Sequence, residues 1–266
     1  RLVTVACCPG TILTSPGISA TWAMTPAPSR IWTSVAASAD GSKLVAVSYG
    51  NWLPAEQTIF TSTNSGATWT GHSGLSSGLA SVASSADGTK LVAVGAAGFG
   101  ADLASVSLSS DSGATWRSAP KNVATNVWRG VASSADGTKL VAVGYTENID
   151  TRYIYLSSDS GVTWDSANAP GEYWSSVASS ADGTRLVATA HFPGRIYTST
   201  NSGLTWTRQP GAPPENWGTV ASSADGTRLV AGGGFSNGQI YTSKDSGVTW
   251  GSDNDPPTLP NIPPQN

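Results

Sequence analysis

Short apolar runs of four to six residues recur along the chain, separated by clusters of glycine, serine and aspartate. The run at 91–95 reads LVAVG, and it follows the more polar segment SVASSADGTK at 81–90. Runs of this length between turn-forming residues predict β-strands, and the ADGT and DSG sequences predict tight turns with glycine at positive φ. Since no segment has a sustained helical period, the pattern predicts an all-β chain.

The sequence itself repeats along with this pattern. The segment SVASSADGTKLVAV at 81–94 returns with small changes at 34–47, 130–143, 176–189 and 219–232. A second motif follows each copy, S-x-D/N-x-G-x-T-W, which we call the box. The boxes end at Trp69, Trp116, Trp164, Trp206 and Trp250, and a weaker copy ends at Trp22. Successive box tryptophans are 42 to 48 residues apart.

Each repeat predicts four strands, A to D, of the form SVASS, LVAVG, IYTS and T-W-x-S. Four strands in a unit of this length are typical of a propeller blade, whereas a β-solenoid has shorter repeats and fewer hairpin turns. We therefore expect one all-β domain, a six-bladed β-propeller of four-stranded antiparallel blades. The expected blades are 2–28, 32–72, 79–119, 128–167, 174–208 and 217–252.

The first expected blade begins on strand B, so its strand A must come from elsewhere or leave an edge unpaired. Leu259-Pro260-Asn261-Ile262 is apolar at the same places as Leu79-Ala80-Ser81-Val82, and it begins nine residues after Trp250, against 10 to 12 in the other repeats. The prolines are tolerated because strand A has a free edge on the channel. We predict that 258–263 completes blade 1 by pairing with Leu2–Ala6. The alternative is a lost upstream strand and a disordered tail.

The box resembles the Asp-box, also called the bacterial neuraminidase repeat, through Ser109, Asp111, Gly113, Thr115 and Trp116 and their equivalents. The five clear boxes and the weaker one cover nearly the whole chain. This resemblance implies a sialidase-like β-propeller. That superfamily includes sialidases, other glycan hydrolases, non-catalytic lectins, sorting receptors and a photosystem II assembly factor, so the resemblance implies a fold more narrowly than a function.

We expect the box residues to be structural. The Asp or Asn side chain can accept hydrogen bonds from backbone N–H groups of its own turn, and the tryptophan can pack between blades. A calcium site is disfavoured because two boxes carry Asn and the weak one carries Gly17. The expected structural residues are Asn64, Asp111, Asp159, Asn201 and Asp245, with Trp69, Trp116, Trp164, Trp206 and Trp250.

Composition excludes several classes of function. The net charge is −3 with no basic block, which argues against nucleic-acid binding, and the apolar runs are too short for a membrane helix. With His72 and His191 as the only histidines, we expect no histidine-rich metal site, and we expect no cofactor. Low lysine, abundant serine and threonine and a proline-rich tail predict an extracellular protein. Adjacent Cys7 and Cys8 can form a strained ring, stay reduced, or bridge to another chain.

The two ends of the expected blades differ in how much they vary. The A–B turns and boxes, which form the turn end, barely change between repeats, while the B–C loops and D–A links, which form the loop end, differ in length and sequence. Varied loops on a constant scaffold are how binding faces are built, so we place any site at the loop end; the alternative is drift in loops without function. The candidate ligand-binding residues are Trp32, Trp52, Trp128, Trp174, Trp217, Tyr145, Tyr173 and Arg152.

Four of these candidates, Trp32, Trp128, Trp174 and Trp217, enter strand A, where Leu79 takes the same place in another repeat. They would cluster around one mouth of the channel. Two interpretations stay open: packing between blades, or a stacking platform for sugar rings or an apolar partner.

The resemblance also invites a search for sialidase chemistry, which needs three arginines, a Tyr–Glu pair and an acid/base Asp. The family's F/Y-R-I-P motif is absent, and the nearest tetrapeptide is Ser29-Arg30-Ile31-Trp32. Tyr173 follows Glu172, but neighbours in an extended chain point to opposite faces. We therefore expect a non-catalytic extracellular recognition or structural propeller that binds a glycan or protein partner. The alternatives are a glycan hydrolase and an assembly-factor scaffold.

Overall fold

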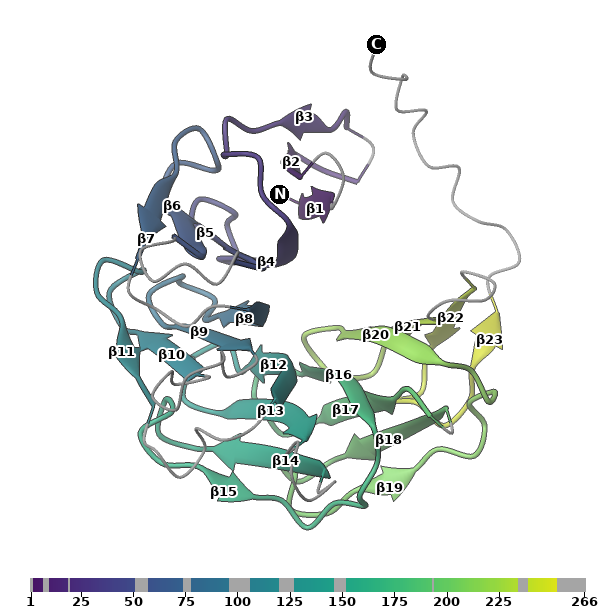
Figure 1. Ribbon diagram of the computed structural model, residues 1–266. Coiled ribbons are helices and arrows are strands. Elements are labelled where there is room, and N and C mark those ends of the chain that lie inside the picture. Colours follow the sequence, from purple (N-terminus) through teal and green to yellow (C-terminus); the bar gives the residue numbers. More distant parts are fainter. Residues whose placement is uncertain are drawn as a thin grey trace.

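The computed structural model describes residues 2–6, 10–18, 20–50, 57–73, 78–95, 106–119, 127–145, 152–192, 194–233 and 239–252, with the backbone alone at Arg152. The described residues form six antiparallel sheets, which stand as blades around a central channel (Figure 1). This arrangement confirms the expected all-β six-bladed propeller. The described residues include no helix that could cross a membrane.

Strands follow one another outwards from the channel in every blade. Blade 1 contains β1 (Leu2–Ala6), β2 (Thr11–Ser15) and β3 (Ala23–Met24). Blade 2 contains β4 (Trp32–Ala37), β5 (Leu44–Ser48), β6 (Ile59–Ser62) and β7 (Thr70–His72). Blade 3 contains β8 (Leu79–Ser84), β9 (Leu91–Gly95), β10 (Val106–Ser109) and β11 (Arg117–Ser118).

The remaining blades repeat this order. Blade 4 contains β12 (Val127–Ser133), β13 (Leu140–Tyr145), β14 (Arg152–Ser157) and β15 (Asp165–Ser166). Blade 5 contains β16 (Trp174–Ser179), β17 (Leu186–Ala190), β18 (Arg195–Ser199) and β19 (Thr207–Arg208). Blade 6 contains β20 (Trp217–Ser222), β21 (Leu229–Gly233), β22 (Ile240–Ser243) and β23 (Gly251–Ser252).

Each described inner strand has a bulge directly after its entry residue. In blade 2 the register with β5 skips Thr33, so that Trp32 pairs with Ser48 and Ser34 with Val47. The same skip occurs in the other four blades with a described inner strand. An extra residue shifts the alternation of side chains by one place. Trp32 and Val35, three residues apart, therefore both face the core between blades 1 and 2.

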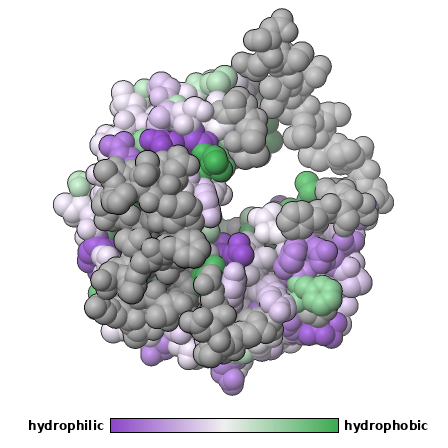
Figure 2. All heavy atoms as spheres, in the orientation of Figure 1, coloured by the Kyte–Doolittle hydropathy of each residue, from purple (hydrophilic) through white to green (hydrophobic). Residues whose placement is uncertain are grey.

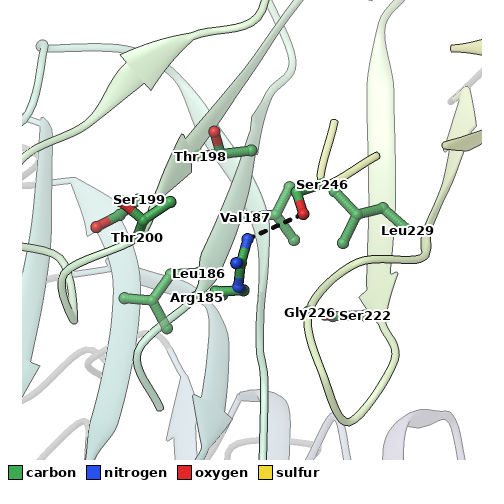
Figure 3. Close-up of a pocket in the computed structure, with 10 residues that line it drawn as sticks. All are labelled: Arg185, Leu186, Val187, Thr198, Ser199, Thr200, Ser222, Gly226, Leu229 and Ser246. Atoms are coloured by element: carbon green, nitrogen blue, oxygen red, sulfur yellow. Dashed lines mark hydrogen bonds between the residues drawn. The ribbon is translucent and has the colours of Figure 1, made fainter. Parts of the chain in front are cut away.

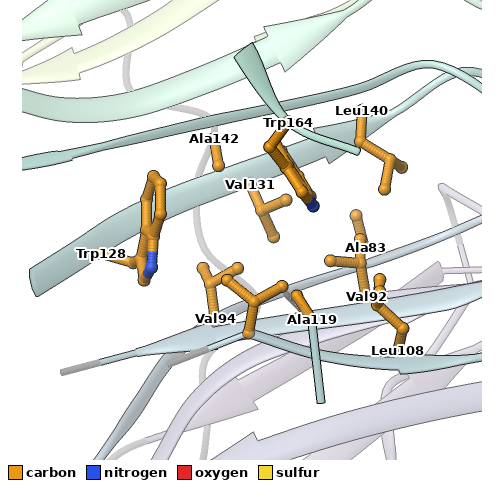
Figure 4. Packing of buried hydrophobic residues seen from close by; sticks show 11 residues of the cluster. Ala83, Val92, Val94, Leu108, Ala119, Trp128, Val131, Leu140, Ala142 and Trp164 are labelled. Atoms are coloured by element: carbon orange, nitrogen blue, oxygen red, sulfur yellow. The ribbon is translucent and has the colours of Figure 1, made fainter. Parts of the chain in front are cut away.

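The hydrophobic core lies between blades rather than within them. Between blades 3 and 4, Val92 and Leu108 of blade 3 pack against Trp128 and Val131 of blade 4, and the box residue Trp164 completes the cluster (Figure 4). The rings of Trp128 and Trp164 lie 6.5 Å apart. Equivalent clusters fill the four other described interfaces, and each contains a box tryptophan.

The box turns satisfy their own polar groups. Thr115 N–H donates to Asp111 Oδ1 at 2.8 Å, and Gly113 N–H donates to Ser109 Oγ at 2.9 Å. The same pairs form in the other four clear boxes, so each Asp or Asn side chain accepts a bond from a backbone N–H group of its own turn. One feature was not predicted: the serine before each box glycine also has positive φ, 57° to 61°. These residues are Ser65, Ser112, Ser160, Ser202 and Ser246.

This left-handed serine also connects neighbouring blades. Arg185, at the start of strand B in blade 5, donates from Nη1 to Ser246 Oγ in the box of blade 6 at 3.0 Å (Figure 3). Lys43 and Lys139 make the same kind of bond to Ser112 and Ser202 in the next blade. A glycine there would relieve the backbone but would lose the hydroxyl that the cation binds.

The A–B turns form a second connection around the channel. Ala39 N–H donates to the carbonyl of Ala86 at 2.7 Å, and Ala86, Ala135 and Ala181 each donate in the same way to the next blade, as far as Ala224. Because these bonds join backbone atoms, they hold five successive turns at a fixed spacing whatever their side chains.

The outermost strands begin later than the sequence predicts. Strand D, of the form T-W-x-S, was predicted to contain the box tryptophan, but β3 and β11 begin one residue after Trp22 and Trp116. The reason is that Trp116 Nε1 donates back to Gly113 O at 3.0 Å, so this residue closes the turn instead of joining the ladder. The predicted closing strand, 258–263, lies outside the described residues, and blade 1 has three described strands.

Candidate functional site

The loop end is described in part. Trp52 and most of the loops at 51–56, 96–105 and 146–151 lie outside the described residues, as does the side chain of Arg152. Blades 4, 5 and 6 contribute most of the described loop-end residues. The links before β16 and β20 lie wholly within the described residues, and so does the B–C loop of blade 5 except for one residue.

The entry tryptophans lie beneath this surface rather than on it. Trp32, Trp128, Trp174 and Trp217 are 0 to 3% exposed. The Trp174 and Trp217 rings stand edge-on to Tyr197 and Tyr241, with centroids 5.3 Å apart. An aromatic ring can stack on a ligand only where its face is open, so these four rings pack between blades and do not form the platform considered from sequence. Leu79, at the same place in blade 3, is also buried.

A buried polar cluster joins two loop-end segments of blade 5. Glu172, in the link before β16, is 6% exposed, and its Oε1 atom lies 2.6 Å from Arg195 Nη1 and 2.7 Å from Tyr197 Oη. Arg195 and Tyr197 both belong to β18, which begins directly after the B–C loop. A buried carboxylate is stabilised when paired and hydrogen-bonded, so this cluster fastens the link to strand C.

Blade 6 carries a related arrangement in place of this ion pair. Glu215 and Gln239 occupy the places of Glu172 and Arg195, and Tyr241 donates from its hydroxyl to Gln239 Oε1 at 2.7 Å. Burial, followed by the charge of Glu215, raises the pKa of Tyr241. Burial and Glu172 likewise raise the pKa of Tyr197, so both hydroxyls act as donors. In blade 2 the same place holds Arg30, whose guanidinium lies 5.8 Å from the centre of the Phe60 ring.

Above these clusters, aromatic side chains are open to solvent. Tyr173 is 46% exposed and Phe192 is 66% exposed, and the backbone of their segments is joined by a bond from His191 N–H to Tyr173 O at 2.8 Å. Glu172 and Tyr173 thus point in opposite directions, as expected for neighbours in an extended chain. Blade 4 adds Tyr145, whose ring lies 5.6 Å from the guanidinium carbon of exposed Arg129.

The arrangement is suited to binding more than to proton transfer. The carboxylates described at the loop end are Glu172, which is buried and paired, and Glu215, which is half-buried beside Tyr241. The Tyr–Glu contact that exists joins Tyr197 to Glu172, not Tyr173. Among the described residues no group of three His, Cys, Asp or Glu side chains is placed to hold a metal ion.

A second hollow lies at the turn end. A groove of about 480 Å³ runs between blades 4 and 5 and is lined by Leu140, Leu156, Leu186 and Leu204 together with polar box residues. Leu204, on the box of blade 5, is 69% exposed. This groove is the alternative candidate for a binding site, next to the loop end.

Sequence reasoning missed the Glu172–Arg195–Tyr197 cluster. The signal was available in the aligned repeats: Glu172 and Glu215 both stand two residues before an entry tryptophan, and Tyr197 and Tyr241 occupy the same place in strand C. What the sequence could not supply is the spatial distance between these segments, because β16, β17 and the B–C loop lie between them in the chain.

No protein-family model matches the chain, and no curated protein matches it. Solved structures do match it. A GH74 enzyme from Niastella koreensis superposes with a TM-score of 0.62 at 21% identity, over 95% of this chain and 37% of that one. YCF48 bound to D1 peptide gives a TM-score of 0.62 at 19% identity, over 93% of this chain and 75% of that one.

Hydrazine synthase of Kuenenia stuttgartiensis gives a TM-score of 0.71 at 13% identity, over 92% of this chain and 80% of that one. These TM-scores show a shared propeller fold, and the three structures are named as two enzymes and one peptide complex. The chain spans about a third of the length of the GH74 enzyme.

Proposed function

We propose that this protein is a non-catalytic recognition propeller that binds its partner at the loop end of blades 4 and 5. The observation that carries the proposal is the pair of exposed aromatic side chains, Tyr173 and Phe192, in segments next to the ion pair of buried Glu172 with half-buried Arg195. We also propose that the chain belongs to the Asp-box propellers of the sialidase-like superfamily and acts outside the cell.

The chemistry of this surface favours a protein segment or a glycan with an apolar face. Exposed aromatic rings gain free energy by covering apolar surface and by stacking, and a nearby guanidinium adds selectivity for acidic or aromatic groups. The base under the rings is rigid, because Glu172 fixes the link to β18 through Arg195 and Tyr197. Rigid aromatic anchors bind with little loss of conformational entropy.

Between the two ligand classes, we favour a protein segment. Arg129 and Tyr145 present a planar cation and ring at the loop end of the neighbouring blade, and Tyr and Arg are enriched at protein interfaces. The peptide complex of a similar propeller supports this choice. A role as an assembly-factor scaffold is one form of it.

A glycan hydrolase is the second candidate, supported by the GH74 fold neighbour. Glycoside hydrolysis requires two carboxyl groups that face one substrate, about 5 to 9.5 Å apart. The described loop end offers Glu172, whose charge is already used by Arg195, and Glu215, which lies beside Tyr241 in the next blade. They do not form a pair of open carboxyl groups that face one substrate, and this argues against that candidate.

Binding should be tested with a random peptide display library and a glycan array, each probed with the purified protein. Replacing Tyr173 and Phe192 together by Ala should weaken the selected ligand at least about tenfold, since each ring contributes about 1 kcal/mol or more. Leu204→Ala is the matched control, because it removes an exposed side chain at the turn end of the same blade. Loss of binding in Leu204→Ala alone would move the site to the groove there.

Catalysis needs a separate measurement. The wild-type protein and Glu172→Gln should be incubated with fluorogenic glycosides, including a sialoside. We expect no hydrolysis by either protein. Turnover by the wild type that Glu172→Gln loses while it stays folded would replace recognition by hydrolysis as the function.

A further inference from the structure

Glu215 in blade 6 lacks the cation that its equivalent in blade 5 has. In blade 5, Glu172 Oε1 lies 2.6 Å from Arg195 Nη1. The residue at the place of Arg195 in blade 6 is Gln239, which carries no charge. Among the described residues no Lys or Arg side chain forms an ion pair with Glu215. Blade 6 therefore keeps the acidic half of this arrangement without the basic half.

The tyrosine beside Glu215 also makes a different bond. In blade 5 the Tyr197 hydroxyl donates to Glu172 Oε1 at 2.7 Å, whereas in blade 6 the Tyr241 hydroxyl donates to Gln239 Oε1 at 2.7 Å. A hydroxyl group has one proton to donate, so the Glu215 carboxylate does not receive it. The carboxylate nevertheless lies close to Tyr241, because its charge, after burial, raises the pKa of that hydroxyl.

The place that a cation would take in blade 6 is open to solvent. The Arg195 side chain, which fills this place in blade 5, is itself 35% exposed. In blade 6 Glu215 is half-buried, and both Gln239 and Asn216 are exposed. A charged group of a partner can therefore reach the carboxylate from outside the molecule.

Glu215 also adjoins the loop that carries Phe192. Gly194 of this loop has a φ of 70°, and a Cβ atom added to it would overlap the carbonyl oxygen of Glu215. The two backbones are therefore in contact, and the loop is joined on its other side to Tyr173 by the bond from His191 N–H. The exposed aromatic pair and the Glu215 carboxylate thus belong to one continuous stretch of the loop end.

We propose that Glu215, with Gln239 and Tyr241 beside it, is a subsite for a guanidinium group of the partner. The partner is then a protein segment with an arginine within a few residues of an apolar side chain. In Figure 2 the described surface of blades 5 and 6, at the lower right, is mostly hydrophilic around a hydrophobic area, which suits such a mixed segment. This inference rests on the proposed function for the position of the partner and adds the charge that the partner carries.

Arginine fits the subsite better than lysine. The equivalent place in blade 5 is filled by the guanidinium of Arg195, so the spacing between the link and strand C suits this group. A guanidinium is planar and can donate to both oxygens of a carboxylate, whereas an ammonium group acts as a point charge. The Gln239 side-chain oxygen lies near the carboxylate and can accept a further bond from the same group.

A small probe tests the subsite directly. The ¹⁵N-labelled full chain should be titrated with N-acetylarginine amide and followed by NMR, with N-acetylcitrulline amide as the uncharged probe of nearly the same shape. We expect saturable shifts of the Gly194, Glu215 and Gln239 amide signals with the arginine probe. The citrulline probe should bind at least about tenfold more weakly, because it lacks the charge that the carboxylate recognises.

Two variants of blade 6 should both remove this binding. Glu215→Gln should lower the affinity for the arginine probe at least about tenfold, and Asp165→Asn, which removes an exposed acidic group from blade 4, should not. Gln239→Arg builds the blade 5 arrangement into blade 6, so it should exclude the probe while the protein stays folded. Equal binding of the two probes would overturn the subsite, and so would unchanged affinity in either blade 6 variant.

A third variant separates this inference from the proposed function. The arginine probe has no aromatic group, so Tyr173→Ala with Phe192→Ala should bind it within about twofold of the wild type. Loss of the probe in this variant alone would assign the guanidinium to the aromatic rings and overturn the subsite.

Peptides selected by display complete the comparison. We expect their affinity to fall in Glu215→Gln, in Tyr173→Ala with Phe192→Ala, and when citrulline replaces their arginine. Peptides that need the aromatic pair but ignore Glu215→Gln would overturn the subsite and leave the proposed function standing. Peptides that need Glu215 but ignore the aromatic pair would support the subsite and overturn the proposed position of the main site.

Discussion

The two ends of each blade obey different rules. At the turn end the Asp or Asn and serine side chains of each box bond to backbone groups a few residues away, as in the bonds from Thr115 N–H and Gly113 N–H to Asp111 and Ser109. At the loop end of blade 5 the polar groups meet across long separations, as Glu172 does with Arg195. Because the box hydrogen bonds are local, the same box sequence can be used in five blades. Because the loop-end bonds join distant residues, they can differ from blade to blade. The turn end therefore specifies the fold, and the loop end is free to specify a partner.

The largest loss of stability is expected in the core, which lies between the turn end and the loop end of the blades. Trp128→Ala removes a side chain that is 1% exposed and packs between blades 3 and 4. Such a truncation should cost about 3 to 5 kcal/mol of the free energy of unfolding, measured by urea denaturation. Trp128→Phe, which retains most of the apolar volume, is the control. If Trp128→Ala unfolded like the wild type but lost its ligand, the entry tryptophans would belong to the loop end after all.

A smaller loss is expected from the turn end. Ser109 is buried, its hydroxyl donates to Asp111 Oδ1 at 2.8 Å, and it accepts from Gly113 N–H at 2.9 Å. Ser109→Ala leaves a buried N–H group without its acceptor and should cost about 1 to 3 kcal/mol in the same assay. Ser110→Ala, one residue further and exposed, should change little. Ligand affinity of folded Ser109→Ala should equal that of the wild type.

The steepest loss of stability in acid should come from the turn end. Hydrogen bonds, first from Ser85 and Ser134 and then from turn N–H groups, lower the pKa of Asp87 and Asp136 from 3.8 to about 2. A carboxyl with a lowered pKa in the folded state stabilises it above the unfolded pKa, and this stabilisation is lost as pH falls through the folded value. Tm should therefore fall steeply between pH 4 and pH 2.

A shallower decline should begin near pH 6.5, because burial lowers the pKa of His72 and the unfolded chain takes up that proton first. Asp87→Asn with Asp136→Asn should flatten the steep part of the curve alone, as thermal scans from pH 2 to pH 8 would reveal. An unaltered steep part in this variant would show that other carboxyls control acid stability.

The smallest effect on stability should come from the exposed loop-end rings. Tyr173→Ala and Phe192→Ala remove side chains with much of their surface in solvent, so each should change the free energy of unfolding by less than about 0.5 kcal/mol. The contrast with Trp128→Ala, measured in the same urea titrations, would show that one aromatic series maintains the fold and the other is available for binding. A loss above about 2 kcal/mol in either variant would remove that distinction.

Much of the fold could be predicted because the same short sequence pattern, with the same local structure, occurs several times in the chain. The A–B turns, the box hydrogen bonds and the packing of Trp116 between blades follow from residues close together in sequence. The bond from Lys43 Nζ to Ser112 Oγ could not be predicted, since it joins residues that are far apart in sequence and lie in neighbouring blades. Likewise the burial of Trp174, which decides against a stacking role, depends on the ring of Tyr197 in another strand.

The backbone hydrogen bonds that link Ala39, Ala86, Ala135, Ala181 and Ala224 have a consequence for the history of the gene. A duplication of one unit inserts a blade whose turn fits its neighbours at once, because the bonds do not depend on side chains. New copies can then change their loops while the inherited hub keeps them in place. Near-identity at one end and divergence at the other are the pattern that such growth leaves in a protein.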